Sequence, residues 1–232
     1  MKTIGLIGGM SWESSIEYYR FINEGVRQKL GGLHSAKSIM ISVDFAEIEV
    51  LQTENRWAEA GERMAAAARS LELGGADFVV LCANTMHKLT ADIQSSIHIP
   101  FLHIADATAE RICEAGLRRV GLLGTRYTME ENFIKDRLVE KYGLEVLIPE
   151  AEDRKLIHQV IFEELVVGII SPLSKAAYTR VIAGLVQRGA EGIILGCTEI
   201  GLLVEAGDSP VPLFDTARIH AEAAVKAALE DL

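Results

Sequence analysis

The feature that most constrains the fold of this 232-residue chain is an internal repeat. Three stretches recur in the same order, at offsets of 116, 114 and 109 residues, and the third match pairs Asp106 with Asp215. One such match is common in proteins of similar composition, but three in one order predict two homologous halves. The matched stretches are TIGLIG (3–8) with RVGLLG (119–124), GADFVVLCANT (75–85) with GAEGIILGCTE (189–199), and HIADATAERI (103–112) with LFDTARIHAE (213–222).

Each half alternates short apolar runs with longer segments of helical spacing that are rich in Ala, Glu and Arg. Continuous apolar runs of this length are typical of strands that are buried on both faces, and strand–helix alternation favours a parallel sheet. The sequence therefore predicts an α/β fold. The expected strands are TIGLIG, KSIMISVDF, DFVVLCA, FLHIA, RVGLLGT, LEVLIP, GIILGC and VPLFDT.

The third repeated stretch also predicts how the halves divide the chain. Each half ends by crossing toward the other, so we expect the C-terminal helix, at about 216–230, to pack on the first half. The predicted domains are 1–105 plus 210–232, and 106–209. Ligands of open α/β sheets bind beyond the carboxyl ends of the strands. We therefore expect one shared site in the cleft between the two halves.

Composition excludes several classes of partner. With 23 Lys and Arg against 33 Asp and Glu, the net charge is −10, which argues against binding to nucleic acid or to an anionic membrane. The first residues lack the apolar region of a signal peptide, and no apolar run has the ~18 residues of a membrane span. Three cysteines at wide spacing predict neither disulfides nor a metal site. We expect a cytoplasmic protein that takes a small-molecule substrate.

The repeat assigns different roles to the cysteines. At the offset of 114 residues, Cys197 matches Ala83 and not Cys82. Successive strand residues face opposite ways, so Cys82 is expected in the core of its own half, and Cys113 is expected to be buried in an amphipathic helix. Cys197 ends a strand just before TEIGLL, which can start a helix, and a helix N-terminus favours the reactive thiolate. A purely structural, buried Cys197 is the alternative.

Several polar groups at the predicted strand ends suit a small anion. Asn84 and Thr85 end the strand that matches the one before Cys197, and Thr198 and Glu199 follow the thiol. The turns GLIGGMS and GTRYT offer backbone amides, and TMEE (128–131) predicts a capping box. Each of these features also fits a simple turn or helix cap. The further candidate contacts in the two turns are Met10, Thr125 and Thr128.

These motifs together resemble the aspartate/glutamate racemase family, including bacterial aspartate racemase-like and broad-specificity amino-acid racemases. The residues that carry the resemblance are IGLIGGMSWESS, CANTMHK, LLGTRYTMEE, LGCTEIGLL and PLFDTARIHAEAA, which span nearly the whole chain. The resemblance implies two pseudo-symmetric, Rossmann-like α/β/α domains with the active site in the cleft between them. It also implies a homodimer, and catalysis without pyridoxal phosphate, another cofactor or a metal.

The family places one cysteine from each half on either side of the substrate's α-carbon. Racemisation removes the α-proton from one face and returns a proton to the other, so two acid/base groups must flank a planar intermediate. By resemblance, Cys197, Thr198 and Glu199 match the second-half motif, and Asn84 and Thr85 match the first. Ala83 stands where the first catalytic cysteine is expected.

Two further residues bear on the substrate and the mechanism. Val166 occupies the place where archaeal aspartate racemases carry a lysine for the side-chain carboxylate, so Gln52 is our candidate polar contact and a surface glutamine the alternative. His87 is interpreted as a solvated or capping residue, with a substitute base as the alternative.

Three functions remain open at this point. The first is a racemase whose leading substrates are aspartate and glutamate. The second is a single-cysteine decarboxylase or isomerase of small carboxylates, and the third is a non-catalytic carboxylate-binding protein.

Overall fold

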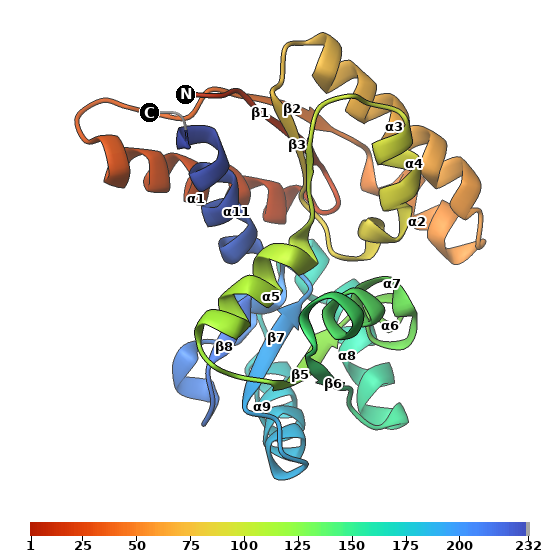
Figure 1. Ribbon diagram of the computed structural model, residues 1–232. Helices are drawn as coiled ribbons and strands as arrows, with labels where there is room; N and C mark the ends of the chain where they lie inside the picture. Colours follow the sequence, from red (N-terminus) through yellow and green to blue (C-terminus); the bar gives the residue numbers. More distant parts are fainter. Residues whose placement is uncertain (231–232) are drawn as a thin grey trace. The chain divides into compact units, whose positions relative to one another are not determined.

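The computed structural model describes residues 1–230, and within them the strands form two parallel sheets of four strands each (Figure 1). The strand order is β2-β1-β3-β4 in the first sheet and β6-β5-β7-β8 in the second. The two sheets therefore share one topology, which confirms the predicted α/β fold. The strands are β1 (Ile4–Gly8), β2 (Ser38–Ser42), β3 (Phe78–Leu81), β4 (Phe101–Leu102), β5 (Arg119–Gly124), β6 (Glu145–Leu147), β7 (Gly192–Gly196) and β8 (Leu213–Asp215).

Helices connect the parallel strands in both sheets. In Figure 1, α1 and α11 lie on one side of the first sheet and α3 and α4 on the other. The helices around the first sheet are α1 (Trp12–Leu30), α2 (Phe45–Thr53), α3 (Trp57–Leu73), the 3-10 helix η1 (Thr85–Leu89), α4 (Thr90–Ser95) and α11 (Thr216–Leu229). The second sheet is accompanied by α5 (Ile104–Glu114), α6 (Arg126–Glu130), α7 (Asn132–Asp136), η2 (Arg137–Lys141), α8 (Ala151–Glu163), η3 (Leu165–Val167), α9 (Pro172–Gln187), α10 (Ile200–Leu203) and η4 (Ala206–Asp208).

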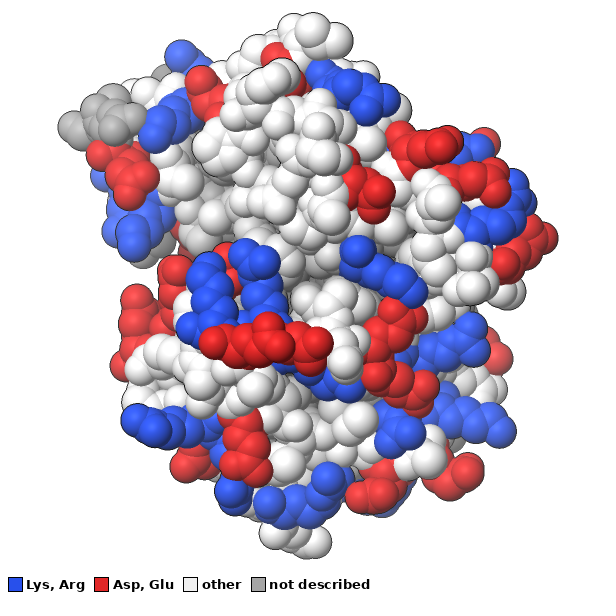
Figure 2. Space-filling view, turned by 45° about the vertical axis from the view of Figure 1, so that its right-hand side comes forward, with Lys and Arg blue, Asp and Glu red and all other residues white. Residues whose placement is uncertain are grey.

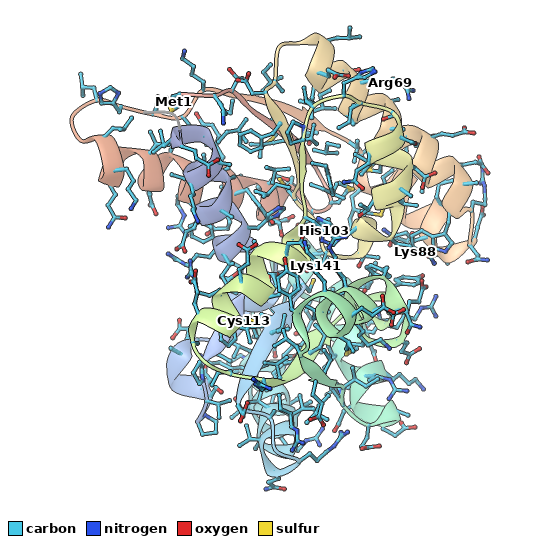
Figure 3. The ribbon with its side chains drawn as sticks, viewed as in Figure 1. Met1, Arg69, Lys88, His103, Cys113 and Lys141 are labelled. Atoms are coloured by element: carbon cyan, nitrogen blue, oxygen red, sulfur yellow. The ribbon has the colours of Figure 1, made fainter. Side chains whose placement is uncertain are left out.

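The chain divides into two compact units, which we call unit 1 and unit 2. Unit 1 comprises Met1–His103 and the chain from His220 on, and unit 2 comprises Ile104–Ile219. Figure 3 shows His103 where the chain leaves β4 for α5. The sequence placed 210–219 in the first half, but β8 pairs with β7, so this segment lies in unit 2. Positions 231 and 232 of the predicted first domain lie outside the described residues.

The C-terminal helix packs on unit 1. The backbone N–H of Lys2 donates to the carbonyl of Ala228 at 2.9 Å. A Cβ added at Gly25 of α1 would lie 3.1 Å from Cγ2 of Val225, so the two helices approach each other closely at this glycine. From His220 on, α11 therefore belongs to unit 1.

Burial along the strands follows their place in the sheet. Strands β1, β3 and β7 are buried along their whole length, whereas the edge strand β2 alternates between half-buried and exposed residues. The prediction that every strand is buried on both faces is therefore wrong for the edges, because an edge strand has a neighbour on one side only.

The three cysteines lie in different surroundings. Val79, Leu81 and Ala83 pack into one core cluster of unit 1, and Cys197 belongs to the corresponding cluster of unit 2. Cys82 is completely buried and, because strand residues alternate, faces away from Ala83. Cys113 is exposed on α5, so its predicted burial is wrong (Figure 3).

The surface carries charges of both signs. On the face shown in Figure 2, basic and acidic side chains stand next to each other over much of the surface. Among the helices of residues 1–230, none combines the length and the apolar character that a membrane crossing requires.

Candidate active site

The candidate site in unit 2 begins where two central strands end side by side. Gly124 of β5 is paired with Gly196 of β7, so Thr125 and Cys197 leave the sheet at the same edge. Both glycines are required by close packing. A Cβ at Gly196 would lie 2.6 Å from the carbonyl oxygen of Leu123, and one at Gly124 would lie 2.7 Å from the carbonyl oxygen of Gly196. Ligands of open α/β sheets bind at this edge.

A thiol and a carboxylate form a hydrogen-bonded pair at the end of β7. The thiol of Cys197 donates to Oε2 of Glu199, with 2.9 Å between Sγ and Oε2. The hydroxyl of Thr198 donates to the same oxygen at 2.8 Å. All three side chains are buried, and Glu199 is only 2% exposed. Buried carboxylates need such donors, because an uncompensated buried charge is strongly unfavourable.

The surroundings of Cys197 hold its thiol in the protonated form. Burial is the main cause that raises the thiol pKa well above its ordinary value, and the negative charge and hydrogen-bond acceptance of Glu199 raise it further. Backbone N–H groups of Thr198 and Glu199 act in the opposite direction but are outweighed. The prediction that a helix N-terminus favours the thiolate is therefore wrong for the resting site. Helix α10 has only four residues and starts at Ile200.

Two threonines stand beside this pair at the end of β5. The hydroxyl of Thr125 accepts from the backbone N–H of Thr128 at 3.3 Å and caps α6. The hydroxyl oxygens of Thr125 and Thr128 are 3.3 Å apart, and both residues are buried. Because α6 begins at Arg126, the predicted capping box at 128–131 is wrong, and the cap lies three residues earlier. The edge of the second sheet thus carries two threonine hydroxyls beside a thiol–carboxylate pair.

The remaining candidate residues lie in unit 1. Met10 and Ala83 belong to one core cluster, and Asn84 and Thr85 are buried at the start of η1. Gln52 is buried, and its Nε2 lies 3.1 Å from Sδ of Met86, so the alternative of a surface glutamine is wrong. The structure therefore brings the predicted residues together as two groups, one in each unit.

Sequence reasoning missed a cluster of buried histidines in unit 1. His87 is buried, and its Nδ1 donates to the carbonyl of Ala83 at 2.7 Å, so its interpretation as a solvated residue is wrong. The rings of His87 and His103 have centroids 4.6 Å apart. Nε2 of His220 donates to the carbonyl of Leu102 at 3.0 Å, which leaves Nδ1 to accept from the hydroxyl of Tyr18 at 2.9 Å.

The environment of His220 keeps its ring neutral. Burial is the main cause that lowers the pKa of His220 to about 4, and its hydrogen bond to Leu102 acts in the opposite direction. No local motif in the sequence signals this cluster, because its members come from separate segments.

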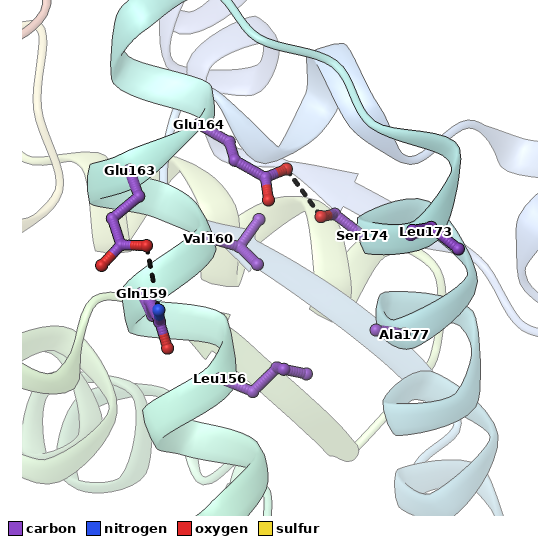
Figure 4. Close-up of a pocket in the computed structure, with 8 residues that line it drawn as sticks. All are labelled: Leu156, Gln159, Val160, Glu163, Glu164, Leu173, Ser174 and Ala177. Carbon is purple, nitrogen blue, oxygen red and sulfur yellow. Dashed lines mark hydrogen bonds between the residues drawn. The ribbon is translucent and has the colours of Figure 1, made fainter.

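A separate hollow of about 250 Å³ lies between α8 and α9 of unit 2 (Figure 4). Oε2 of Glu164 accepts from the hydroxyl of Ser174 at 2.6 Å, and Nε2 of Gln159 donates to Glu163 at 2.9 Å. Its charged lining groups are carboxylates, so it does not suit a carboxylate substrate. The lining residues are Leu156, Gln159, Val160, Glu163, Glu164, Leu173, Ser174 and Ala177.

Both units are α/β domains of one topology, and unit 2 carries a thiol–carboxylate pair at the carboxyl edge of its sheet. Residues 7–224 match the sequence model of the Asp/Glu/Hydantoin racemases, and the chain belongs to this family. It is therefore an isomerase, as the resemblance implied.

Known proteins of similar sequence and structure agree with this assignment. A candidate Asp/Glu racemase from Yersinia pestis is 55% identical, with a TM-score of 0.92 over 99% of this chain and 100% of that one. An aspartate racemase homologue from Pyrococcus horikoshii is 36% identical, with a TM-score of 0.85 over 99% of this chain and 100% of that one. The broad specificity amino-acid racemase RacX of Bacillus subtilis is 26% identical over 68% of this chain and 67% of its own length.

Proposed function

We propose that this protein is a cofactor-independent amino-acid racemase that moves the α-proton of its substrate with Cys197. Aspartate and glutamate are the proposed substrates. The observation that carries the proposal is the buried hydrogen bond from the Cys197 thiol to Glu199, with 2.9 Å between Sγ and Oε2. A thiol needs a base within hydrogen-bond reach to become a thiolate, and this carboxylate is such a base.

Proton transfer within the pair forms the reactive thiolate. Glu199 takes the thiol proton along the existing hydrogen bond, so that the thiolate forms beside a neutral acid and the pair keeps a single negative charge. Protonation of Glu199 removes its negative charge, which is one of the causes that raise the thiol pKa. The thiolate of Cys197 then takes the α-proton of the substrate, and the electron pair of the C–H bond moves into the α-carboxylate as an enediolate.

The neighbouring hydroxyl and amide groups are proposed to stabilise that intermediate. Thr125 and Thr128 lie at the same sheet edge as Cys197, and Thr198 follows it. Charge-assisted hydrogen bonds from such donors to the α-carboxylate strengthen as negative charge develops there. By the repeat, Asn84 and Thr85 correspond to Thr198 and Glu199, and they are proposed as further binding residues together with Met10 and Gln52.

Racemisation also requires that a proton return to the opposite face of the α-carbon. Ala83 is the counterpart of Cys197 in the repeat, and its methyl group carries no proton to give. Water is the proposed donor on that face, and the hydroxide that it leaves takes the proton that Glu199 accepted from the thiol, which restores the resting pair. We therefore expect slow racemisation, with unequal rates from the two enantiomers.

The same residue favours a second candidate, a single-cysteine decarboxylase of small malonates. Loss of CO2 leaves a carbanion that needs only one proton, which Cys197 supplies, so a methyl group at position 83 is no handicap. Release of CO2 from small malonates, abolished in Cys197→Ala, would favour this activity over racemisation.

Interconversion of enantiomers tests the proposal. Each enantiomer of aspartate and glutamate is incubated with the natural chain or with Ala83→Cys, and the products are separated by chiral chromatography. We expect interconversion by both proteins, and faster interconversion by Ala83→Cys. Cys82→Ala is the matched control, because Cys82 is the adjacent buried thiol on the opposite strand face. No interconversion by either protein would exclude the racemase. Tight substrate binding without any turnover would identify a carboxylate-binding protein.

A further inference from the structure

His87 of unit 1 holds two consecutive backbone carbonyls with two N–H groups. Its backbone N–H donates to the carbonyl of Asn84 at 3.0 Å, and its ring Nδ1 donates to the carbonyl of Ala83 at 2.7 Å. The paired residues of β3 end at Leu81, opposite Ile7 of β1, so strand pairing does not fix the backbone at position 83. His87 therefore fixes the chain where it leaves the first sheet.

The ring of His87 is itself held in place by its neighbours. The residue is only 1% exposed. The centroid of its ring lies 4.6 Å from that of His103, 5.5 Å from that of Phe101 and 5.8 Å from that of His220. These neighbours come from β4, from the residue after it and from α11, so close packing on several sides restricts the orientation of the ring. A ring buried to this extent cannot reach a substrate directly, and it acts through the backbone that it binds.

Unit 2 holds the corresponding carbonyl in a different way. By the repeat, Ala83 corresponds to Cys197, and at the same offset of 114 residues His87 corresponds to Gly201, which has no side chain. The carbonyl of Cys197 accepts from the backbone N–H of Ile200 at 3.1 Å. The contact from a side chain is therefore particular to the strand end that carries Ala83.

We propose that His87 is a positioning residue for position 83 and for the two residues that follow it. Asn84 and Thr85, which are proposed to bind the substrate, come directly after the carbonyl that the ring holds. Placement matters here because a shift of a reacting or binding group by about 1 Å can slow a reaction about 10²-fold. The expected effect on proton transfer rests on the proposed function, whereas the contact itself does not.

Two variants of the full chain separate the hydrogen bond of His87 from the volume of its ring. In His87→Asn, the side-chain amide provides an N–H for the same carbonyl, and in His87→Leu the side chain has no donor. His220→Leu is the matched control, because His220 belongs to the same buried cluster but donates to the carbonyl of Leu102. All three are made together with Cys82→Ala and Ala83→Cys, so that the thiol introduced at position 83 has no neighbouring thiol.

Alkylation by iodoacetamide tests the positioning without any substrate, and mass spectrometry of the digested protein gives the rate at each thiol. Ala83 is 5% exposed and Cys197 is 8% exposed, so both positions are protected. We expect His87→Leu to speed alkylation at position 83 about tenfold or more, because the segment after β3 loses its hydrogen bond. The rate at Cys197 should not change, and His87→Asn should restore most of the protection at position 83. His220→Leu should leave the ratio of the two rates unchanged.

Two outcomes of the alkylation experiment would overturn the proposal. Equal acceleration at position 83 and at Cys197 would indicate a general loss of stability rather than positioning. No acceleration at position 83 would show that the hydrogen bond from His87 is not needed to hold this segment.

Exchange of the substrate's α-proton in D2O tests the consequence for the reaction. The enantiomer of aspartate or glutamate that the natural chain exchanges reports on Cys197, and in Ala83→Cys its mirror image reports on position 83. We expect His87→Leu to slow exchange of the second enantiomer about tenfold or more relative to the first, and His87→Asn to restore the ratio. Exchange with an unchanged ratio would overturn the proposal. If no enantiomer is exchanged, the racemase is excluded, and selective alkylation would still support the positioning by His87.

Discussion

Replacing Glu199 with glutamine separates the charge of this residue from its shape. Glutamine retains an oxygen that accepts the hydrogen bond from Cys197 but cannot take the thiol proton. We therefore expect racemisation to fall in Glu199→Gln. We also expect the thiol pKa to fall, because the negative charge that helps to raise it is gone. Activity and thiol reactivity should thus change in opposite directions.

The distance between the two groups sets the size of the effect. At 2.9 Å from Sγ to Oε2, Glu199 is placed for direct proton transfer. General acid–base groups typically contribute ~10²–10⁴-fold, or about 3–5 kcal/mol of activation free energy, and Glu199→Gln should lose a factor in this range. Glu199→Asp shortens the side chain by about 1.5 Å and moves the carboxylate to about 4.4 Å from Sγ. We expect it to lose about 10²-fold.

Two measurements on the same variants check these values. Chiral chromatography gives the rate of interconversion, and the pH dependence of iodoacetamide alkylation follows the thiol, with Cys197→Ala subtracting reaction at the other cysteines. In Glu199→Gln, alkylation should begin at lower pH than in the natural chain while interconversion falls. Interconversion at the natural rate in this variant would refute the assignment of Glu199 as the base.

Further predictions concern stability. Gly196→Ala should destabilise the fold by about 2 kcal/mol or more, because the added Cβ would lie 2.6 Å from the Leu123 carbonyl oxygen. The matched control Gly184→Ala in α9 meets no atom within 4 Å and should stabilise by up to about 1 kcal/mol; urea unfolding measures both. His220 has its pKa lowered from 6.5 to about 4 by burial, so its unfolded form binds protons first on acidification. The contribution of His220 to the free energy of unfolding is therefore complete above pH 6.5, and about 3 kcal/mol of it is lost as the pH falls toward 4. His220→Leu should remove this dependence of the unfolding free energy on pH. Cys82→Ala should cost about 1 kcal/mol of stability, measured by urea unfolding, and leave interconversion intact, since Cys82 is buried on the strand face opposite Ala83.

The repeat and the apolar runs were sufficient to predict the architecture. Continuous apolar runs separated by amphipathic segments leave few alternatives to parallel α/β sheets, and the matching offsets predict two sheets of one topology. The pattern does not show which strands lie at the edges of each sheet. The part-exposure of β2 follows from its place in the strand order, and sequence periodicity does not report that order.

The sequence located the residues of the candidate site better than it predicted their chemical state. Cys197 and Glu199 are two residues apart in the sequence, so their proximity could be predicted from it. The state of the thiol depends on burial and on the direction of the Glu199 carboxylate, which are three-dimensional properties. The contact of His87 with the Ala83 carbonyl, and its neighbour His103, likewise depend on how the strands meet.

Exchange of the substrate's α-proton with solvent deuterium is the most direct test of the central claim that Cys197 moves this proton. Each enantiomer of aspartate and glutamate is incubated in D2O with the natural chain or with Cys197→Ala, and proton NMR follows the α-hydrogen signal. We predict that the natural chain exchanges at least one enantiomer of one substrate, because one working thiol suffices on one face. Cys197→Ala should exchange none. Exchange by Cys197→Ala at the natural rate, or no exchange of any enantiomer by the natural chain, would contradict the claim.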